Sequence, residues 1–532
     1  MRVRTLRRWA VATLALTLLA ACVPQQTPSP SAPAPSPSAT AAVPTGEVID
    51  VSLVPKLEVD RPTSSESKAQ PAGFEDAPKG NGLAGYLKQQ LDWRACGGKY
   101  QCAEVLAPLD YANPGEQAIT LALAKKAATK SPKLGTLFVN PGGPGASGRN
   151  LVTYFASTGL EQYDIVGWDP RGTNASTPVK CFDDAQTQAF TELDSSPDDA
   201  AETEALIVGT WQFAQSCRQH SGALLDHIST VDTVRDLDLL RQLVGDQKLS
   251  YLGYSYGTQI GAYYADLFPQ QVGRLVLDAA VDITDDDTVI QAMGFDLALG
   301  NFAAWCARQN CSLGSSKQEV LKTITDFFDE LDAKPLDVDG RPLTQSIAVS
   351  GVAAYLYGGI PAWKTLSNDL KPALAGDGTR LLKASDSLND RNEDGTFGSL
   401  FYSFPAIGCA DSYDKGVVEA EQRWVSDQAK APIFGKYFGP GYTCPLWTAR
   451  STIQFKPTGS GAAPIVVVGA TGDPATPYQN AVTMAKQLES GVLVTYEGEG
   501  HGTFGGKSRC VDALVIDYLV NGTVPTDGVR CQ

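Results

Sequence analysis

One five-residue turn, GYSYG at 253–257, constrains the fold of this chain more than any other stretch. An apolar, β-prone run at 249–252 precedes it, and the small and apolar residues at 258–267 have the spacing of a helix. In such a strand–turn–helix the central serine takes a strained backbone conformation, and the flanking glycines leave room for neighbouring chain. The pattern predicts an exposed nucleophilic hydroxyl on Ser255, although an ordinary β-to-α turn remains open on this motif alone.

Apolar runs and helical spacing alternate along the middle of the chain, which predicts an α/β fold with a mostly parallel central sheet covered on both faces. Strands are expected at 102–109, 118–124, 135–139, 163–168, 249–252, 274–277, 464–469 and 491–496. Helices are expected at 231–244, 258–267, 320–331 and 510–519. Function should lie at the carboxyl ends of the parallel strands, where Ser255 also lies.

The chain has 532 residues, more than one simple core usually fills, so an insertion or a second domain is expected. After residue 285 helical stretches alternate with loops rich in Gly, Pro and Asp, which predicts a mainly helical cap inserted into the core. The acidic turn at 389–395 is interpreted as a solvated turn, because the spacing and closing Glu of a calcium loop are absent. The expected organisation is a lipoprotein signal peptide at 1–21, a Pro/Ser/Ala-rich tether at 22–47, a hydrolase-like core at 90–285, the cap insertion at 286–430 and the second part of the core at 431–532.

The N-terminus has the pattern of an export signal, in which arginines precede an apolar run at 9–19 that is too short to span a membrane as a mature anchor. The run ends in Leu-Ala-Ala-Cys at 19–22, which resembles a bacterial lipobox and predicts lipidation of Cys22. A plain secretory signal cut nearby remains open. We therefore expect a monomer in the bacterial cell envelope, held to the outer face of the membrane by a lipid anchor, with release from the membrane as the alternative. The net charge of −16 argues against nucleic acid or an anionic membrane surface as a ligand.

The eleven cysteines agree with export. Without Cys22 they number ten, and an even number in an exported chain predicts disulfides rather than metal ligands. Sequence spacing suggests local pairs, although spacing alone does not prove connectivity. The expected pairs are Cys96–Cys102, Cys181–Cys217, Cys306–Cys311, Cys409–Cys444 and Cys510–Cys531.

A glycine-rich loop, NPGGPG at 140–145, follows the expected strand at 135–139. Consecutive glycines let backbone N–H groups point into a shared space, which is what a developing oxyanion requires. A tight turn that merely needs positive φ is the alternative. We expect the amide of Tyr256 and one amide from Gly142 or Gly143 to form the oxyanion hole.

A serine nucleophile needs a general base, and histidine is the usual one. The chain has only three histidines, at 220, 227 and 501. His220 and His227 precede Ser255 on a segment that leads into a helix, whereas His501 lies in a glycine-flanked loop after the last expected core strand. His501 is therefore the expected base.

The acid that orients this base should lie at the same edge of the sheet. Asp473 is favoured because its loop follows the strand directly before that of His501, and Asp278, which also follows a strand, is the rival. Thr476 is interpreted either as a brace of the acid loop or as a helix N-cap. Arg171 is expected to form a structural ion pair with Asp169 or with another carboxylate.

Together these motifs resemble a known family. GGPG at 142–145, GYSYG at 253–257, GDPATP at 472–477 and GHG at 500–502 are similar to motifs of the secreted tripeptidyl aminopeptidases, in the prolyl-aminopeptidase-like α/β-hydrolase group. The resemblance spans roughly residues 90–530 and includes the family's order of nucleophile, acid and base. Relatives in the wider group often carry His before GGPG, where this chain has Pro141.

The resemblance implies a serine exopeptidase that releases short peptides from free N-termini without a metal or an organic cofactor. Its substrates would be peptides with a free N-terminus, so a carboxylate should bind their ammonium group. Asp411 is the candidate, and a plain surface acid is the alternative reading of that residue. Two other functions remain open: a carboxylesterase or lipase with the same triad, and an inactive lipid-anchored binding protein on a hydrolase scaffold.

Overall fold

The computed structural model describes residues 73–80, 82–284, 287–412, 416–449 and 455–532. All of them belong to one unit, Gly46–Gln532. The expected signal peptide, the tether and Cys22 lie outside the described residues. Within the described part of the chain, every helix is too short or too polar to cross a bilayer.

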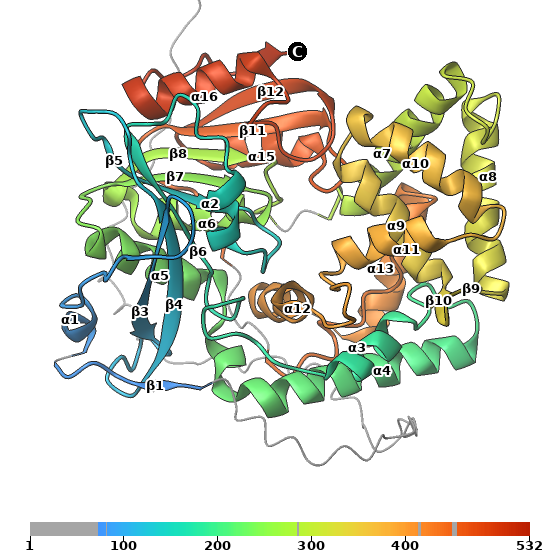
Figure 1. Ribbon diagram of the computed structural model, residues 1–532, viewed down its shortest axis with the longest axis horizontal. Helices are drawn as coiled ribbons and strands as arrows, with labels where there is room; N and C mark the ends of the chain where they lie inside the picture. Colours follow the sequence, from blue (N-terminus) through green and yellow to red (C-terminus); the bar gives the residue numbers. More distant parts are fainter. Residues whose placement is uncertain (1–72, 81, 285–286, 413–415, 450–454) are drawn as a thin grey trace, which may run out of the picture. The chain divides into compact units, whose positions relative to one another are not determined.

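A single large sheet organises this unit, with strand order β13-β12-β11-β8-β7-β5-β6-β4-β3-β2 and β1 paired to β4 (Figure 1). Its strands are β1 (Glu75–Asp76), β2 (Arg94–Ala95), β3 (Tyr100–Pro108), β4 (Gln117–Lys126), β5 (Gly135–Asn140), β6 (Tyr163–Trp168), β7 (Leu249–Tyr254), β8 (Val272–Asp278), β11 (Ile465–Gly472), β12 (Gly491–Glu499) and β13 (Val529–Cys531). Strands β5 to β8 and β11 to β13 are parallel, and β4 joins them antiparallel through β6. The expected α/β-hydrolase sheet is confirmed, and the short edge strands β1, β2 and β13 were not predicted.

Helices cover the two faces of the sheet, as the alternation of buried side chains along β5 shows. Leu137 and Val139 pack in a cluster with α2 (Gly148–Tyr154) and α16 (Arg509–Asn521). Phe138 points the other way, into the cluster of the helices on the opposite face. These are α5 (Thr230–Leu243), α6 (Tyr256–Leu267) and α15 (Tyr478–Gln487).

The segment between β8 and β11 is mainly helical and has a hydrophobic cluster of its own, which includes Phe302, Phe328 and Leu366. It is drawn in yellow and orange in Figure 1. Its elements are α7 (Gln291–Arg308), α8 (Lys317–Ala333), β9 (Leu336–Val338), β10 (Arg341–Leu343), α9 (Gln345–Tyr357), α10 (Ile360–Ala373), α11 (Thr379–Leu388), α12 (Ser399–Asp411), α13 (Val417–Lys430) and α14 (Phe434–Tyr437). The remaining short and connecting helices are α1 (Leu83–Tyr86), α3 (Asp184–Thr191), α4 (Ala200–Ser221) and the 3₁₀ turns Gly222–His227 and Pro269–Gln271.

Helix α12 differs from the other helices of this segment, because its buried face packs into the cluster of the sheet. Tyr402, Ala406 and Ile407 belong to that cluster. Tyr402 also stacks on Phe213 of α4, with ring centroids 6.4 Å apart. The opposite face of α12 carries Phe404, whose exposed fraction is 52%.

The disulfides and the ion pair of Arg171 were both predicted from the sequence. The five expected disulfide pairs are all present, and Cys409–Cys444 ties α12 to the segment that precedes β11. The buried Arg171 guanidinium forms the expected structural ion pair, with Asp236 as its partner at 2.6 Å. Asp169 instead accepts a hydrogen bond from Ser147, the N-cap of α2. Disulfides in this number are typical of exported proteins.

Candidate active site

Ser255 lies between the end of β7 and the start of α6, in the strained conformation that the motif predicts, with φ of 56° and ψ of −126°. The turn needs both of its glycines. A Cβ on Gly253 would lie 2.4 Å from the carbonyl oxygen of Gly257, and one on Gly257 would lie 3.0 Å from that of Asn140. The Ser255 N–H donates to the carbonyl oxygen of Asp278 at 3.0 Å, which fixes the turn to the end of β8.

The structure brings Asp473 and His501 together. The Nδ1 atom of His501 lies 2.9 Å from Oδ1 and 3.0 Å from Oδ2 of Asp473, whose side chain is fully buried. The same carboxylate accepts the amides of Ala475 and Thr476, both at 2.9 Å. With its acceptors in this arrangement, Asp473 favours the tautomer in which Nδ1 carries the proton, and Nε2 is then free to act as a base.

Thr476 contacts both members of this pair. Its amide donates to the Asp473 carboxylate, and its hydroxyl lies 3.4 Å from Nδ1 of His501. Helix α15 begins at Tyr478 with Pro477 at its N-cap position, so Thr476 is not the cap of that helix. Of the two interpretations from the sequence, the brace of the acid loop is the one that these contacts support.

The turns of Ser255 and His501 lie against each other. The Tyr254 hydroxyl donates to the carbonyl oxygen of Phe504 at 3.2 Å, and its ring lies 3.5 Å from the position of a Cβ on Gly502. Within the described residues, no hydrogen bond joins Ser255 Oγ to the His501 ring. In structures without substrate, such catalytic contacts are often longer than a hydrogen bond and shorten when substrate binds.

The glycine-rich loop packs directly on the nucleophile turn. A Cβ on Gly142, which has φ of 92°, would lie 2.8 Å from Cβ of Ser255 and 3.0 Å from the amide nitrogen of Tyr256. The Gly142 amide itself donates to Oδ1 of Asn140 at 2.9 Å, so it does not point into an oxyanion site. Among the described residues, the amides of Gly143 and Tyr256 have no acceptor, and they are the remaining donors of the expected pair.

The rival acid, Asp278, lies at the end of β8 with its side chain fully buried. Its Oδ2 accepts the amides of Thr503 at 2.9 Å and Phe504 at 2.6 Å, two consecutive residues after His501. Its carboxylate makes no hydrogen bond with the imidazole ring in the described structure. Burial raises the pKa of the Asp278 carboxyl to about 6.

Tyr357, the last residue of α9, joins the inserted segment to the His501 loop. Its carbonyl oxygen accepts the His501 amide at 2.9 Å, and the two rings meet edge to face with centroids 5.2 Å apart. Burial and then the nearby Asp473 charge raise the pKa of Tyr357 to about 12. Sequence reasoning missed this residue, because nothing in the pattern around it distinguishes it from other aromatic residues on a helix.

Asp411, the expected ammonium-binding residue, lies at the end of α12 and contacts the start of α5. Its Oδ1 accepts the amide of Thr230 at 2.8 Å, and its Oδ2 accepts the Thr230 hydroxyl at 2.5 Å and Gln259 Nε2 at 3.3 Å. The same hydroxyl lies 2.5 Å from that of Tyr256. Burial raises the pKa of Asp411 to about 6, and no cationic side chain among the described residues pairs with it.

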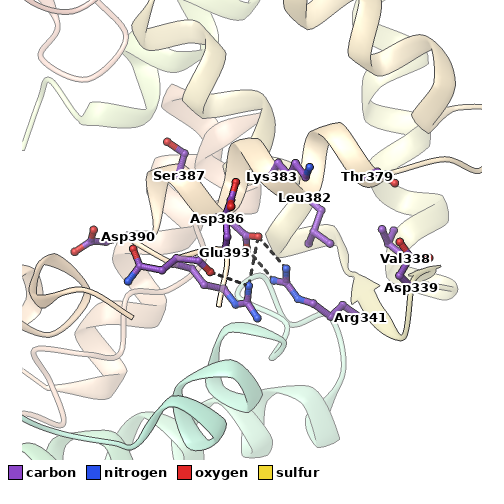
Figure 2. Close-up of a pocket in the computed structure, with 12 residues that line it drawn as sticks. Val338, Asp339, Arg341, Thr379, Leu382, Lys383, Asp386, Ser387, Asp390 and Glu393 are labelled. Atoms are coloured by element: carbon purple, nitrogen blue, oxygen red, sulfur yellow. Dashed lines mark hydrogen bonds and ion pairs between the residues drawn. The ribbon is translucent and has the colours of Figure 1, made fainter. Parts of the chain in front are cut away.

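Two other clusters of charged side chains lie apart from these residues. A cavity of about 740 Å³ is lined by the β9–β10 hairpin, α11 and residues 390–393 (Figure 2). Figure 2 shows the Arg341 guanidinium directed at Asp386, with two contacts of 2.8 Å. A second group, Asp194, Glu202 and Asp332, has carboxylate oxygens within 4.8 Å of one another, a spacing that could hold a cation. Neither cluster contains a predicted site residue.

Sequence comparisons find relatives along most of this chain. Residues 431–531 match the family described as TAP-like protein. Serine protease Hip1 of Mycobacterium tuberculosis is 34% identical over 481 residues, which cover 84% of this chain and 91% of Hip1. Carboxylesterase B of the same organism is 35% identical over 453 residues, or 81% of this chain and 86% of the relative. Tripeptidyl aminopeptidase of Streptomyces lividans is 29% identical over 481 residues, which cover 83% of this chain and 86% of the relative.

Similar solved structures include an alpha/beta hydrolase from a Medee basin deep-sea metagenome library, at 11% identity and a TM-score of 0.35 over 77% of this chain and 96% of that one. Another is proline iminopeptidase of Mycobacterium smegmatis, at 15% identity and a TM-score of 0.32, with 79% of this chain and 98% of that one covered. The relatives named as peptidases match along most of their length, and the carboxyl-terminal match includes Asp473 and His501. The chain therefore belongs to the tripeptidyl aminopeptidase family of α/β-hydrolase serine peptidases.

Proposed function

We propose that the protein is an exopeptidase that releases short peptides from free N-termini through an acyl-enzyme on Ser255. The Asp473–His501 pair supports this most directly, because it lies against the turn that holds a strained serine. In this proposal Ser255 is the nucleophile, His501 the general base and acid, and Asp473 the residue that orients the imidazole and stabilises its charged form.

In the acylation step, Nε2 of His501 takes the proton of the Ser255 hydroxyl while Oγ attacks the scissile carbonyl carbon. The carbonyl oxygen becomes an oxyanion, which the amides of Gly143 and Tyr256 stabilise, each by about 3 kcal/mol. The intermediate collapses as the C–N bond breaks, and His501 returns its proton to the leaving amine. The released fragment is the carboxyl-terminal part of the peptide.

In the deacylation step, water replaces the leaving amine. His501 takes a proton from the water as its oxygen attacks the acyl carbon, and the same two amides stabilise the second oxyanion. Collapse of this intermediate returns the proton to Ser255 Oγ and releases the N-terminal fragment as a carboxylic acid, which loses its proton to the solvent. In this proposal the protein's own side chains and backbone amides carry both steps.

Asp411 is the proposed partner of the substrate ammonium group. It is a partly buried carboxylate without a cationic partner among the described residues, and it is linked to the oxyanion residue Tyr256 through the hydroxyl of Thr230. A carboxylate accepts up to about four hydrogen bonds, so its present contacts leave room for an ammonium donor. A charge-assisted bond of this kind would select peptides with a free N-terminus.

The exposed face of α12 offers a wall for the peptide between these two points. At its start, Leu400 lies 3.1 Å from the position of a Cβ on Gly143, in the oxyanion loop. Phe404, which is exposed, lies one turn later. Gly408 lies a further turn along and has no atom within 4 Å of its Cβ position. At 1.5 Å per residue the helix from Leu400 to Asp411 is about 16 Å long, the span of roughly four to five extended residues. This length supports a short peptide as the acyl portion.

The test compares a tripeptidyl anilide that has a free amine with its N-acetylated form. We expect the wild type to hydrolyse the free-amine substrate faster than the acetylated one, and Ser255→Ala to hydrolyse neither. Asp411→Asn should have a 10- to 100-fold higher KM for the free-amine substrate only, because it loses a charge-assisted hydrogen bond worth about 1.5–3 kcal/mol. The matched control is Asp390→Asn, because Asp390 caps the other end of α12 through the Leu400 amide at 3.0 Å. Preference for the acetylated substrate would contradict the exopeptidase, and equal effects of Asp411→Asn on both substrates would remove Asp411 from the site.

A carboxylesterase is the second candidate, because a relative with that name is 35% identical over 81% of this chain. An esterase would use the same triad but would not need an ammonium site. Hydrolysis of a short acyl ester at a higher kcat/KM than the free-amine anilide would favour it. In that case Asp411→Asn should leave ester hydrolysis unchanged.

The location proposed for the enzyme is the outer face of the bacterial cell membrane, with a lipid on Cys22. The arginines, the apolar run and the Leu-Ala-Ala-Cys motif of residues 1–22 support it. Intact-mass measurement of the protein from its native membrane should show a chain that begins at Cys22 and carries acyl groups. A soluble Cys22→Ser variant is expected, and membrane retention of that variant would contradict the lipid anchor.

A further inference from the structure

Asp278 is a fully buried carboxylate that the proposed mechanism does not use as acid, base or oxyanion donor. It lies at the end of β8, where the register of the sheet places it beside Tyr254 of β7 and Val468 of β11. These neighbouring strands lead into the turns of Ser255 and Asp473, so Asp278 lies between them in the sheet.

Its backbone and its side chain hold two different loops. The carbonyl oxygen of Asp278 accepts the amide of Ser255 at 3.0 Å. Oδ2 accepts the amides of Thr503 and Phe504, the second and third residues after His501. Asp278 is thus bonded to both the nucleophile turn and the base loop.

A second bond reaches the same loop from β7. The Tyr254 hydroxyl donates to the carbonyl oxygen of Phe504 at 3.2 Å, so both polar groups of the Phe504 main chain are bonded to the ends of adjacent strands. The other carboxylate oxygen of Asp278, Oδ1, is buried without a hydrogen-bond partner in the described structure. An unsatisfied buried oxygen is destabilising, so a role in stability alone explains this residue poorly.

Asp278 also contributes to the charge of the site. Burial raises its pKa, the hydrogen bonds from the Phe504 and Thr503 amides lower it, and the nearby Asp473 and His501 have smaller opposite effects. Burial, and then the Asp278 charge, raise the pKa of Tyr254. Burial lowers the pKa of Lys507, which Asp473 and Asp278 partly offset, and Lys507 donates to the carbonyl oxygen of His501 at 2.8 Å. The titratable groups around Asp278 are therefore the Asp473 carboxylate, the His501 imidazole, the Tyr254 phenol and the Lys507 ammonium.

We propose that Asp278 is a positioning residue, which holds the main chain after His501 against the nucleophile turn so that the imidazole faces Ser255, with Tyr254 as a second tether. The inference rests on the proposed roles of these two catalytic residues, and it adds a residue to the machinery that carries them. Loss of the tether lets the loop move, and a displacement of about 1 Å at a base can cost on the order of 100-fold in rate.

The experiment measures the rate at which a fluorophosphonate labels Ser255, together with kcat and KM, in Asp278→Ala and Asp278→Asn. Alanine removes both bonds to the loop, whereas the asparagine carbonyl can still accept both amides. We expect about a 100-fold loss of labelling rate and kcat in Asp278→Ala with KM unchanged, and less than a 10-fold loss in Asp278→Asn. Rescue by asparagine would show that the hydrogen bonds, rather than the charge, position the loop.

The matched control is Asp296→Ala in α7. The Asp296 carboxylate also accepts two consecutive amides, those of Ile433 at 3.1 Å and Phe434 at 2.7 Å, but in the inserted segment rather than at the triad. We expect it to lower the melting temperature without slowing the labelling of Ser255. A labelling rate in folded Asp278→Ala equal to that of the wild type, or a loss as large in Asp278→Asn as in Asp278→Ala, would overturn the proposal.

If Asp278→Ala does not fold, Tyr254→Phe replaces it, since this variant removes the other tether and keeps the ring. Slower labelling with unchanged KM supports the proposal, and an unchanged rate overturns it. Labelling needs no peptide, so a wild-type protein that labels at Ser255 but fails to release peptides would contradict the proposed exopeptidase and leave this inference standing.

Discussion

The carboxyl edge of the sheet and the exposed face of α12 are built in opposite ways. At the sheet edge the carboxylates of Asp473 and Asp278 are fully buried and each accepts hydrogen bonds from more than one neighbour. On α12, Phe404 is half exposed and Gly408 faces open space. A buried, hydrogen-bonded polar region thus lies beside an open, mostly apolar one.

This difference separates chemistry from selection. Groups that stabilise a transition state need fixed positions, because displacement reduces the rate steeply. A surface that accepts varied peptide side chains needs area and few fixed contacts. We therefore expect changes at the sheet edge to lower kcat, and changes on α12 to raise KM.

The sharpest test of the first half of this comparison is His501→Ala. The variant removes the proposed general base and should lower kcat by a factor on the order of 10⁴ to 10⁶, with KM little changed. Peptide hydrolysis and fluorophosphonate labelling measure the loss. His220→Ala serves as the control, because the His220 ring bonds only Ser216 among the described residues. Similar losses in the two variants would argue that the effect is not specific to the triad.

Gly142→Ala tests how tightly the oxyanion loop is fitted to the nucleophile turn. The added Cβ would meet the Tyr254 carbonyl oxygen at 2.5 Å and Cβ of Ser255 at 2.8 Å, so the loop must move. We expect a loss of about 10²- to 10³-fold in kcat, comparable with removal of one oxyanion donor. Gly245→Ala is the matched control, since Gly245 also has positive φ, 86°, but nothing lies within 4 Å of its Cβ position. It should lower stability by about 1 kcal/mol and keep activity.

Asp411 lies where the two regions meet, so its effect should depend on pH. Its carboxyl has a pKa of about 6, and only the ionised form pairs strongly with an ammonium group. KM for free-amine peptides should therefore fall by roughly 10-fold as the pH rises through about 6, and Asp411→Asn should remove this dependence. A pH profile of KM, measured beside an N-acetylated substrate, checks it. The same KM profile in wild type and variant would contradict the assignment.

The folded-state pKa of Asp411 lies above the value of about 3.9 for an unfolded aspartate. The unfolded chain therefore releases this proton first, and Asp411 lowers the free energy of unfolding as the pH rises from about 4 to about 6. In Asp411→Asn the melting temperature should therefore depend less on pH over this range than in the wild type.

Phe404→Ala is the smallest expected effect and tests the open face of α12. Removal of the ring takes away apolar area that a substrate side chain could cover, at about 25 cal/mol per Å². We expect KM to rise about three- to tenfold for peptides with apolar side chains and kcat to stay constant. The control is Val425→Ala on α13, whose side chain is 68% exposed on another helix. A fall in kcat without a change in KM would contradict the division between the two regions.

Much of the sheet edge could be predicted, because its signals are local. The strained serine turn, the glycine-rich loop and the order of Ser255, Asp473 and His501 all follow from short stretches of sequence. The sequence does not distinguish Gly142 from Gly143 as the oxyanion donor, and only the bond from the Gly142 amide to Asn140 does so. Periodicity does not specify which way an individual amide points.

The contacts of Asp278, Tyr357 and Thr230 escaped prediction for a different reason. Each joins segments that are far apart in the chain, such as Asp278 with Thr503 and Thr230 with Asp411. No local pattern distinguishes a carboxylate that accepts distant amides from one that faces solvent. Asp278 in particular was predicted only as a rival acid.

The sequence by itself determined the class of fold, the nucleophile turn and the resemblance to the family, because strand periodicity and turn glycines act over a few residues at a time. It suggested the disulfide pairs, and the structure decided them. The tertiary structure decided which acid meets the imidazole, which amide is left for the oxyanion and where α12 presents its open face. These depend on strand register and on packing between distant segments, so they exist only once the sheet has formed.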